Sequence, residues 1–196
     1  MIATREWVKD LMSKVFKKYD EDVTSNISFW IENGYLPDPK IMPLIPVMTS
    51  NTTPKGVASA SSIYNENFNA WCAFRNSDDL SSVNEPYKRW NSANTAGNGE
   101  WLKYEFENPV TCRSFKICPL YFNGASYLKS YKLQGSNNDS NWDDLYSETL
   151  ENVATNKQVT ITNNTAYKYY RLLATSNSYD SSVGCISIIN FQLYAK

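Results

Sequence analysis

Three short segments combine aromatic rings with amide and carboxylate side chains, and together they suggest binding chemistry. They are SIYNENFN at 62–69, PLYFNGASY at 119–127 and TSNSYDSS at 175–182. A sugar has an apolar C–H face and a rim of hydroxyls, so a ring can stack on it while amides and carboxylates bind its rim. Stacking candidates are Tyr64, Tyr121, Phe122 and Tyr179, and hydrogen-bonding candidates are Asn65, Asn67, Asn123, Asn177 and Asp180. Ordinary surface turns use the same residue types, so that reading stays open beside the first.

The residues that catalysis usually needs are missing or badly spaced. The chain has no histidine, which excludes Ser-His-Asp and Cys-His catalysis. The paired carboxylates Asp78-Asp79 and Asp143-Asp144 are adjacent, so in extended chain they point apart. A glycosidase needs two carboxylates facing one bond at about 5–10 Å. We therefore expect no enzyme, and we treat a glycoside hydrolase or lyase as the disfavoured reading.

The four cysteines do not form a recognisable metal or redox motif. No Cys-x-x-Cys spacing occurs among Cys72, Cys112, Cys118 and Cys185, and no histidine could complete a zinc site. We expect buried thiols rather than disulfides.

Charge and hydropathy exclude two further classes. The 196 residues carry 19 basic and 20 acidic side chains, without the basic excess of nucleic-acid binders. No apolar run approaches the roughly 20 residues of a membrane span, so no membrane insertion is expected. The first ten residues lack the apolar core of a secretory signal. Either the protein does not use that export route, or it leaves the cell within a larger particle.

The first 46 residues differ in pattern from the rest. Residues 1–36 are expected to be a helical docking segment, because apolar residues recur there with helical spacing. That stripe comprises Val8, Leu11, Met12, Val15, Phe16 and Tyr19. It could pack on the protein's own body, or it could dock on a partner or a second copy. Residues 37–46 contain four prolines, which predicts an extended linker before a domain at 47–196.

Short alternating segments separated by turn residues fill the chain after residue 46. Strands are expected at 55–61, 101–107, 111–118, 127–136, 143–148, 157–162, 167–175 and 185–194. In WLKYEF, Leu102, Tyr104 and Phe106 share one face. ENPV at 107–110 is expected to be a hairpin turn, and Trp90 and Trp101 are expected to anchor the core. The pattern predicts a mainly β fold, an all-β sandwich or jelly roll.

Several segments, taken in order, resemble the discoidin family, also called the F5/8 type C domain. They are ASASS 58–62, AWCAF 70–74, RWNSA 89–93, EWLKYEFENPVTCRSFKI 100–117, LKSYKLQGSNNDSNW 128–142, KYYRLL 168–173 and INFQLY 189–194. The resemblance implies an eight-stranded antiparallel jelly-roll β-sandwich of the galactose-binding-like type, here with a short N-terminal helical segment. It also implies a ligand at loops of one end, usually a glycan and sometimes a phospholipid head group or a protein.

The sequence departs from the family where a metal ion is often held. Many sugar-binding members carry Asp-Gly after the AxxAF segment and a late glutamate, both beside a calcium ion. This chain has Arg75-Asn76 and Asn190 at those places. Asp78, Asp79 and Asn190 are the remaining candidate oxygen ligands. We therefore expect no cofactor, with calcium as the open alternative. The histidine and the arginine that often contact galactose in the family are not visible in this sequence, and histidine is absent altogether, so galactose specificity is not carried over.

A helical segment, a proline-rich linker and one discoidin-like module are similar to the layout of phage virion components. This analogy suggests a non-catalytic module that recognises host surface glycans and is present in several copies on a virion. Its N-terminal helix would then bind other virion proteins. The alternatives are a structural decoration or connector subunit of a virion, or a cell-surface or cytoplasmic location.

Overall fold

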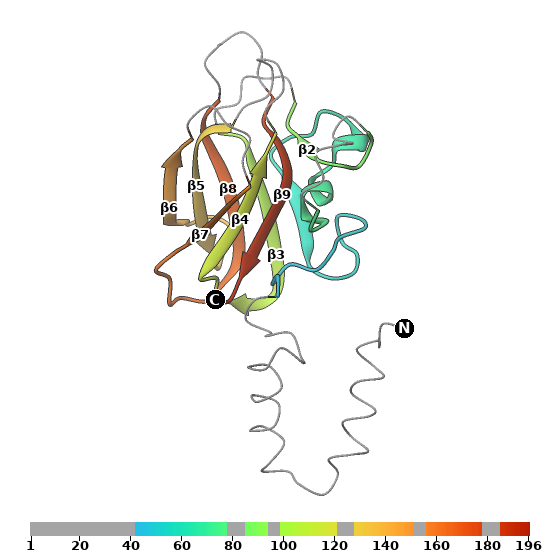
Figure 1. Cartoon of the computed structure of the whole chain (residues 1–196). Coiled ribbons are helices and arrows are strands. Elements are labelled where there is room, and N and C mark those ends of the chain that lie inside the picture. The colour runs from blue at the N-terminus through green and yellow to red at the C-terminus, as the bar shows by residue number, and fades with distance from the viewer. Residues whose placement is uncertain (1–41, 78–84, 94–98, 121–127, 151–155, 178–184) are drawn as a thin grey trace, which may run out of the picture. The chain divides into compact units, whose positions relative to one another are not determined.

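The computed structural model describes residues 42–77, 85–93, 99–120, 128–150, 156–177 and 185–196 (Figure 1). The chain divides into two compact units, Met1–Met42 and Pro43–Lys196. The predicted helical segment at 1–36 lies outside the described residues and stays a prediction. Within the described part, no helix is long and apolar enough to cross a membrane.

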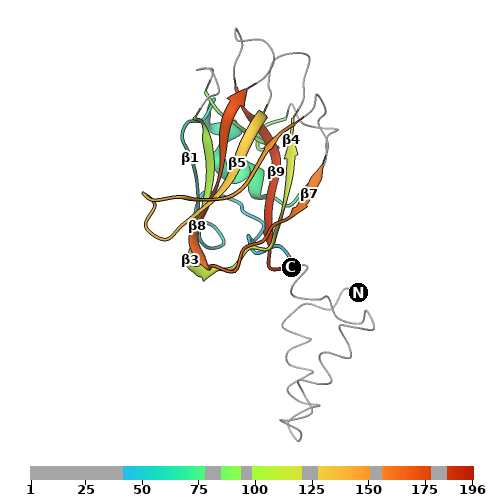
Figure 2. The same ribbon diagram turned by 90° about the vertical axis from the view of Figure 1, so that its left-hand side faces the viewer.

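Two antiparallel sheets face each other and form a β-sandwich (Figures 1 and 2). The five-stranded sheet has the order β1 (Val57–Ala60), β3 (Trp101–Val110), β8 (Tyr167–Asn177), β5 (Leu128–Ser136) and β6 (Asp143–Thr149). The four-stranded sheet has the order β2 (Trp90–Asn91), β9 (Ser187–Tyr194), β4 (Ser114–Pro119) and β7 (Lys157–Thr160). The prediction of a mainly β antiparallel sandwich is confirmed. Each of the eight expected strands is present, and the two-residue β2 was not expected.

The core lies between the sheets because alternate residues of each strand point inward. Leu102, Tyr104 and Phe106 of β3 share the inner face as predicted, and all three are buried. Two short 3-10 helices, η1 (Glu66–Phe68) and η2 (Ala70–Phe74), follow β1. Phe74 of η2 lies with its ring centroid 5.5 Å from that of Tyr104 and 5.9 Å from that of Phe191, so η2 joins the two layers.

The two expected core tryptophans have different environments. Trp90 is 1% exposed and its indole Nε1 donates a 3.0 Å hydrogen bond to the Ser62 carbonyl, which confirms its core position. The prediction for Trp101 is wrong, because Trp101 is only partly buried and packs outside the core, with Lys103 Nζ lying 5.0 Å from its ring. Strand alternation explains the difference, since Leu102 points inward and its neighbour must point outward.

The predicted hairpin turn at 107–110 is also wrong. These residues continue β3, whose pairing with β8 shifts register between Glu105 and Val110. The next strand, β4, belongs to the other sheet, where it pairs with β7 and β9. Pro109 has no N–H for a ladder, and a register shift is where a strand tolerates that loss. The chain therefore crosses to the other layer between Val110 and Ser114 instead of reversing within one sheet.

Part of the predicted linker belongs to the sandwich. Pro43 forms a bridge with Tyr194, and Leu44 N donates to the Leu193 carbonyl at 2.7 Å. Ile45 is 1% exposed and joins the core. The linker prediction is thus wrong for 43–46, where backbone pairing with β9 fixes the chain. Residues 37–41 lie outside the described residues.

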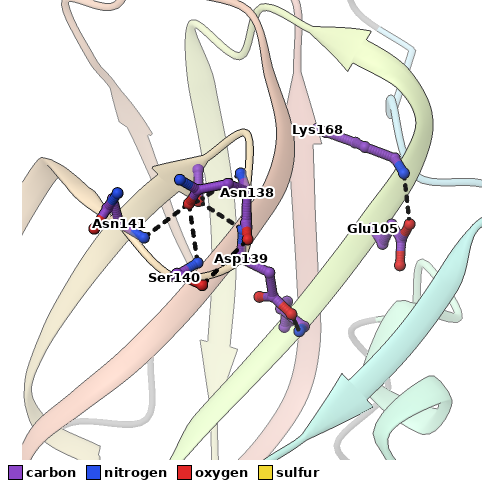
Figure 3. A network of polar contacts seen from close by, with 8 residues as sticks. Glu105, Asn138, Asp139, Ser140, Asn141 and Lys168 are labelled. Carbon is purple, nitrogen blue, oxygen red and sulfur yellow. Dashed lines mark hydrogen bonds and ion pairs between the residues drawn. The ribbon is translucent and has the colours of Figure 1, made fainter.

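The outer face of the five-stranded sheet is covered by mutually paired charges (Figure 3). Lys103 Nζ lies 2.6 Å from Asp139 of the β5–β6 turn, and Lys168 Nζ lies 2.8 Å from Glu105. In that turn, Asn138 Oδ1 accepts hydrogen bonds from the backbone N–H groups of Ser140 and Asn141. The Lys103–Asp139 pair holds the β5–β6 turn against β3.

Candidate ligand-binding site

The segment 62–69 presents one aromatic ring to solvent. Tyr64 is 51% exposed, and its ring meets that of Phe68 edge-to-face with centroids 6.1 Å apart. Asn65 is the N-cap residue before η1, and its side chain accepts a 2.9 Å hydrogen bond from Asn67 N. An asparagine at this position caps the free N–H groups of a short helix. The cap fixes the loop, so the Tyr64 and Phe68 rings have a defined relative orientation.

The Arg89 guanidinium lies over the Phe68 ring. Its guanidinium carbon is 4.5 Å from the Phe68 centroid, and its Nε donates a 2.9 Å hydrogen bond to Asn91 Oδ1. The same Asn91 oxygen accepts a 2.6 Å hydrogen bond from Ser187 Oγ, while the Asn91 carbonyl accepts 2.8 Å from Tyr64 N. Asn91 therefore links loop 62–69, β2 and β9, and it holds Arg89 beside Phe68.

Strand pairing between distant segments positions this group. Trp90 lies opposite Ile188, and Asn91 lies opposite Ser187. Ser92 N donates to the Ile186 carbonyl at 2.9 Å, and Ser92 Oγ accepts from Ile186 N at 2.8 Å. Because Trp90 points into the core, Arg89 before it points out of the core. Figure 1 shows β2 next to β9 on the side of the sandwich that carries the 3-10 helices.

The Arg89 guanidinium is an incompletely paired cation. Burial lowers its pKa from the ordinary value, and the nearby Cys185 thiol opposes that shift. An arginine nevertheless stays protonated at neutral pH. Its Nη1 is buried and makes no hydrogen bond. The exposed Tyr64 ring and the Arg89 guanidinium thus both contact Phe68, and Asn91 orients the guanidinium. This arrangement can stack on an apolar ring face and donate hydrogen bonds to oxygen atoms.

The structure describes only some of the predicted site residues. Tyr64, Asn65 and Asn67 lie beside Phe68 in one loop. Asn177 is the last residue of β8, opposite Leu128 in the ladder with β5. The remaining candidates, Tyr121, Phe122, Asn123, Tyr179 and Asp180, lie outside the described residues. The proposal that the three loops meet is therefore still a prediction.

Sequence reasoning missed Phe68, Arg89 and Asn91. RWNSA was used only as a fold signature, yet one signal could have found Arg89. An arginine directly before a core tryptophan in a strand must point away from the core. The contact with Phe68 has no sequence signal, because η1 and β2 meet only in the folded chain.

The described residues include no candidate metal cluster. No group of three or more His, Cys, Asp or Glu side chains lies close enough there to hold an ion. Asn190 is fully buried in β9, opposite Cys118, while Asp78 and Asp79 lie outside the described residues. Calcium binding therefore stays a prediction.

All four cysteines are free and buried, which confirms the prediction of thiols. Burial raises the pKa of the Cys72 and Cys112 thiols to about 12, so these two are poor nucleophiles. The described part also contains pockets of about 250 Å³ beside Tyr104 and about 270 Å³ between β5 and β6. Neither Tyr64 nor Arg89 lines these two pockets.

The sequence and the fold match known proteins. Residues 50–189 match the F5/8 type C domain. Chitosan-binding module 1 of a chitosanase/glucanase from Paenibacillus sp. IK-5 is 26% identical, with a TM-score of 0.56 over 74% of this chain and 98% of that module. The family 32 carbohydrate-binding module of Clostridium perfringens NanJ, solved with galactose, is 18% identical, with a TM-score of 0.55 over 71% of this chain and 93% of that module.

A third structure, the family 32 module of AlyQ with 4,5-unsaturated mannuronic acid, is 16% identical, with a TM-score of 0.52 over 71% of this chain and 95% of that module. The last two likenesses concern the fold alone. Comparison with curated proteins gave no significant match. Because the F5/8 type C match spans well over half of the sequence, this chain belongs to the F5/8 type C domain family.

Proposed function

We propose that this chain is a non-catalytic carbohydrate-binding module that contacts its ligand through Tyr64. The observation that carries the proposal is the exposed Tyr64 ring, which meets Phe68 edge-to-face, with the Arg89 guanidinium over that same Phe68 ring. Family membership supports it, because similar modules bind chitosan or were solved with a saccharide. An exposed ring with neighbouring donors suits the two faces of a sugar.

The ligand we propose is a glycan on a host surface, and the protein would be displayed in several copies on a phage particle. Single-sugar contacts are weak, with millimolar dissociation constants corresponding to about 4 kcal/mol. Repeated copies convert such contacts into stable attachment through avidity. The amphipathic stripe in residues 1–36 supports docking of the N-terminal segment on the particle.

The test uses the full chain, presented multivalently on a glycan array, with two tyrosine variants. Tyr64→Ala removes the stacking ring, and Tyr169→Ala removes a partly buried ring from the outer face of the five-stranded sheet. We expect Tyr64→Ala to lose about 1 kcal/mol per site, or roughly fivefold in affinity, while Tyr169→Ala retains binding. Both variants should keep circular dichroism of a folded sandwich.

Two results would overturn the proposal. One is an array on which the unmodified chain binds no saccharide. The other is a Tyr64→Ala variant that binds as well as the unmodified chain. In a particle that carries the protein, Tyr64→Ala should reduce adsorption to host cells and leave assembly intact. Loss of assembly would instead support the structural decoration or connector role.

A further inference from the structure

Arg89 differs from three lysines of the sandwich in how its charge is compensated. Lys103, Lys132 and Lys168 each lie 2.6–2.8 Å from a carboxylate oxygen. Arg89 has no carboxylate within ion-pair distance among the described residues, and its contacts there are the Asn91 amide oxygen and the Phe68 ring. A partly buried cation without a counter-charge is unfavourable, because burial removes the water that would solvate it.

One nitrogen of Arg89 is also left without a hydrogen bond. Nη1 is among the few buried side-chain nitrogen and oxygen atoms without a partner. Buried polar groups in folded proteins are nearly always paired, so an unpaired donor points to a group that is absent from the free chain. The Arg89 side chain as a whole is only partly buried, which gives a ligand a route to the guanidinium.

The surroundings of Arg89 favour an anion over a neutral hydroxyl. The Nε of Arg89 already donates its hydrogen bond to Asn91, and Phe68 covers one face of the guanidinium. The donors of Arg89 left for a ligand are the two Nη groups, of which Nη1 is buried in the free chain. A carboxylate accepts two parallel N–H bonds from two such groups, and these charge-assisted bonds are stronger than bonds to a hydroxyl.

We infer that the saccharide recognised at this site is acidic, with a carboxylate that pairs with Arg89 while a sugar ring stacks on Tyr64. Both residues lie against the same Phe68 ring, so one short oligosaccharide can reach both. The ligand class is a uronic or other carboxylate-bearing glycan. This inference rests on the proposed function and adds to it the charge of the ligand.

The experiment compares each acidic glycan with a copy in which the carboxylates have been reduced to alcohols. The probes are alginate, polygalacturonate, hyaluronan and polysialic acid oligosaccharides, titrated calorimetrically into the full chain. At least one acidic form should bind, and its carboxyl-reduced copy should bind roughly 10- to 100-fold more weakly, as loss of a charge-assisted bond predicts. Binding should also weaken as salt rises, because salt screens the exposed part of the ion pair.

Three variants assign the effect to Arg89. Arg89→Gln should show the same roughly 10- to 100-fold loss toward the acidic glycan and none toward its reduced copy. Arg89→Lys should recover part of the affinity, because it keeps the charge without the planar fork. Arg113→Gln is the matched control, since Arg113 is exposed and donates to Asn164, and it should bind normally.

The outcomes separate this inference from the proposed function. Equal binding of acidic and reduced glycans, or full binding by a folded Arg89→Gln, overturns the acidic-ligand inference and leaves carbohydrate binding standing. Binding confined to neutral saccharides would likewise overturn the acidic-ligand inference and leave carbohydrate binding standing. If no saccharide binds, both fail. The reduced glycans are tested on the unmodified chain, so the result stands even where a variant folds poorly.

Discussion

The hydroxyl of Tyr104 in the core donates a 2.6 Å hydrogen bond to the carbonyl oxygen of Lys55, at the entrance to β1. The next residue, Gly56, has a φ of +71°. A Cβ atom at Gly56 would lie 2.3 Å from the Tyr104 hydroxyl oxygen, far inside van der Waals contact. The close approach of Tyr104 to the backbone therefore requires glycine at position 56.

This geometry predicts different costs for two glycine substitutions. Gly56→Ala should lower the free energy of unfolding by roughly 2–4 kcal/mol, through left-handed backbone strain and overpacking against Tyr104. Gly99→Ala also has a positive φ, +87°, but its Cβ would meet nothing within 4 Å, so the expected loss is about 1 kcal/mol. Urea unfolding of both variants measures the difference. Equal losses would show that the contact with Tyr104 relaxes freely.

The two tryptophans beside the 94–98 segment should also respond differently. Trp90→Ala leaves a cavity in the core and a lost hydrogen bond to Ser62, so we expect a loss of about 3–5 kcal/mol. Trp101→Ala removes a partly buried ring and its contact with Lys103, which should cost only about 1 kcal/mol. Denaturant midpoints at constant m-value provide the comparison. A Trp101 variant as unstable as the Trp90 variant would contradict the outward position of Trp101.

Glu148 should make the sandwich sensitive to acid. It accepts a 2.9 Å hydrogen bond from the Tyr131 hydroxyl and pairs with Lys157 of β7, which joins the two sheets at one edge. Burial raises the pKa of the Glu148 carboxyl, but hydrogen bonds from Lys157 and Tyr131 outweigh it and hold the pKa below its usual range. A depressed pKa gives stability that is present above the unfolded value of about 4.3 and lost as pH falls through the folded value.

We therefore expect the unmodified chain to lose stability below about pH 4.3, and Glu148→Gln to flatten that part of the profile. Urea unfolding between neutral and acidic pH measures it. Asp144→Asn is the control, because the pKa of Asp144 is also lowered by its hydrogen bonds from Lys132 and Gln134, but its side chain is 49% exposed. Exposed ion pairs contribute little, so the control should change the profile less. The same flattening in both variants would contradict the role of Glu148.

Buried tyrosines should limit stability at high pH. Burial raises the pKa of the Tyr104 and Tyr170 hydroxyls to about 12, against about 10 in the unfolded chain. A raised pKa gives stability that is present below the unfolded value and lost as pH rises toward the folded one. Unfolding, followed by circular dichroism, should therefore accompany the last part of the tyrosine titration at 295 nm. Complete ionisation of all tyrosines in a chain that keeps its native spectrum would count against this.

Much of the fold could be predicted because strands have a local signal. Period-two alternation located eight strands and put Leu102, Tyr104 and Phe106 on the inner face. The same alternation places Trp101 outside, and the error there came from weighing residue type above position. Strand β2 has only two residues and no period of its own, and it exists because it pairs with β9. The turn expected at 107–110 failed because Asn-Pro marks a break in the ladder, and only the second sheet decides whether the chain reverses or crosses.

The candidate site, like the fold, could be predicted from the sequence only in part. The sequence by itself determined the residue types, excluded histidine chemistry, and identified Tyr64 as a ring in a polar loop. Only the tertiary structure decided that Tyr64 and Arg89 both contact Phe68, that Asn91 holds both to β9, and that Arg89 has an unpaired nitrogen. The reason is physical: alternation and capping act over a few residues, while these contacts join segments up to 96 positions apart, as for Ser187 and Asn91. Such contacts depend on which distant segments pair and pack, and local preference does not encode that.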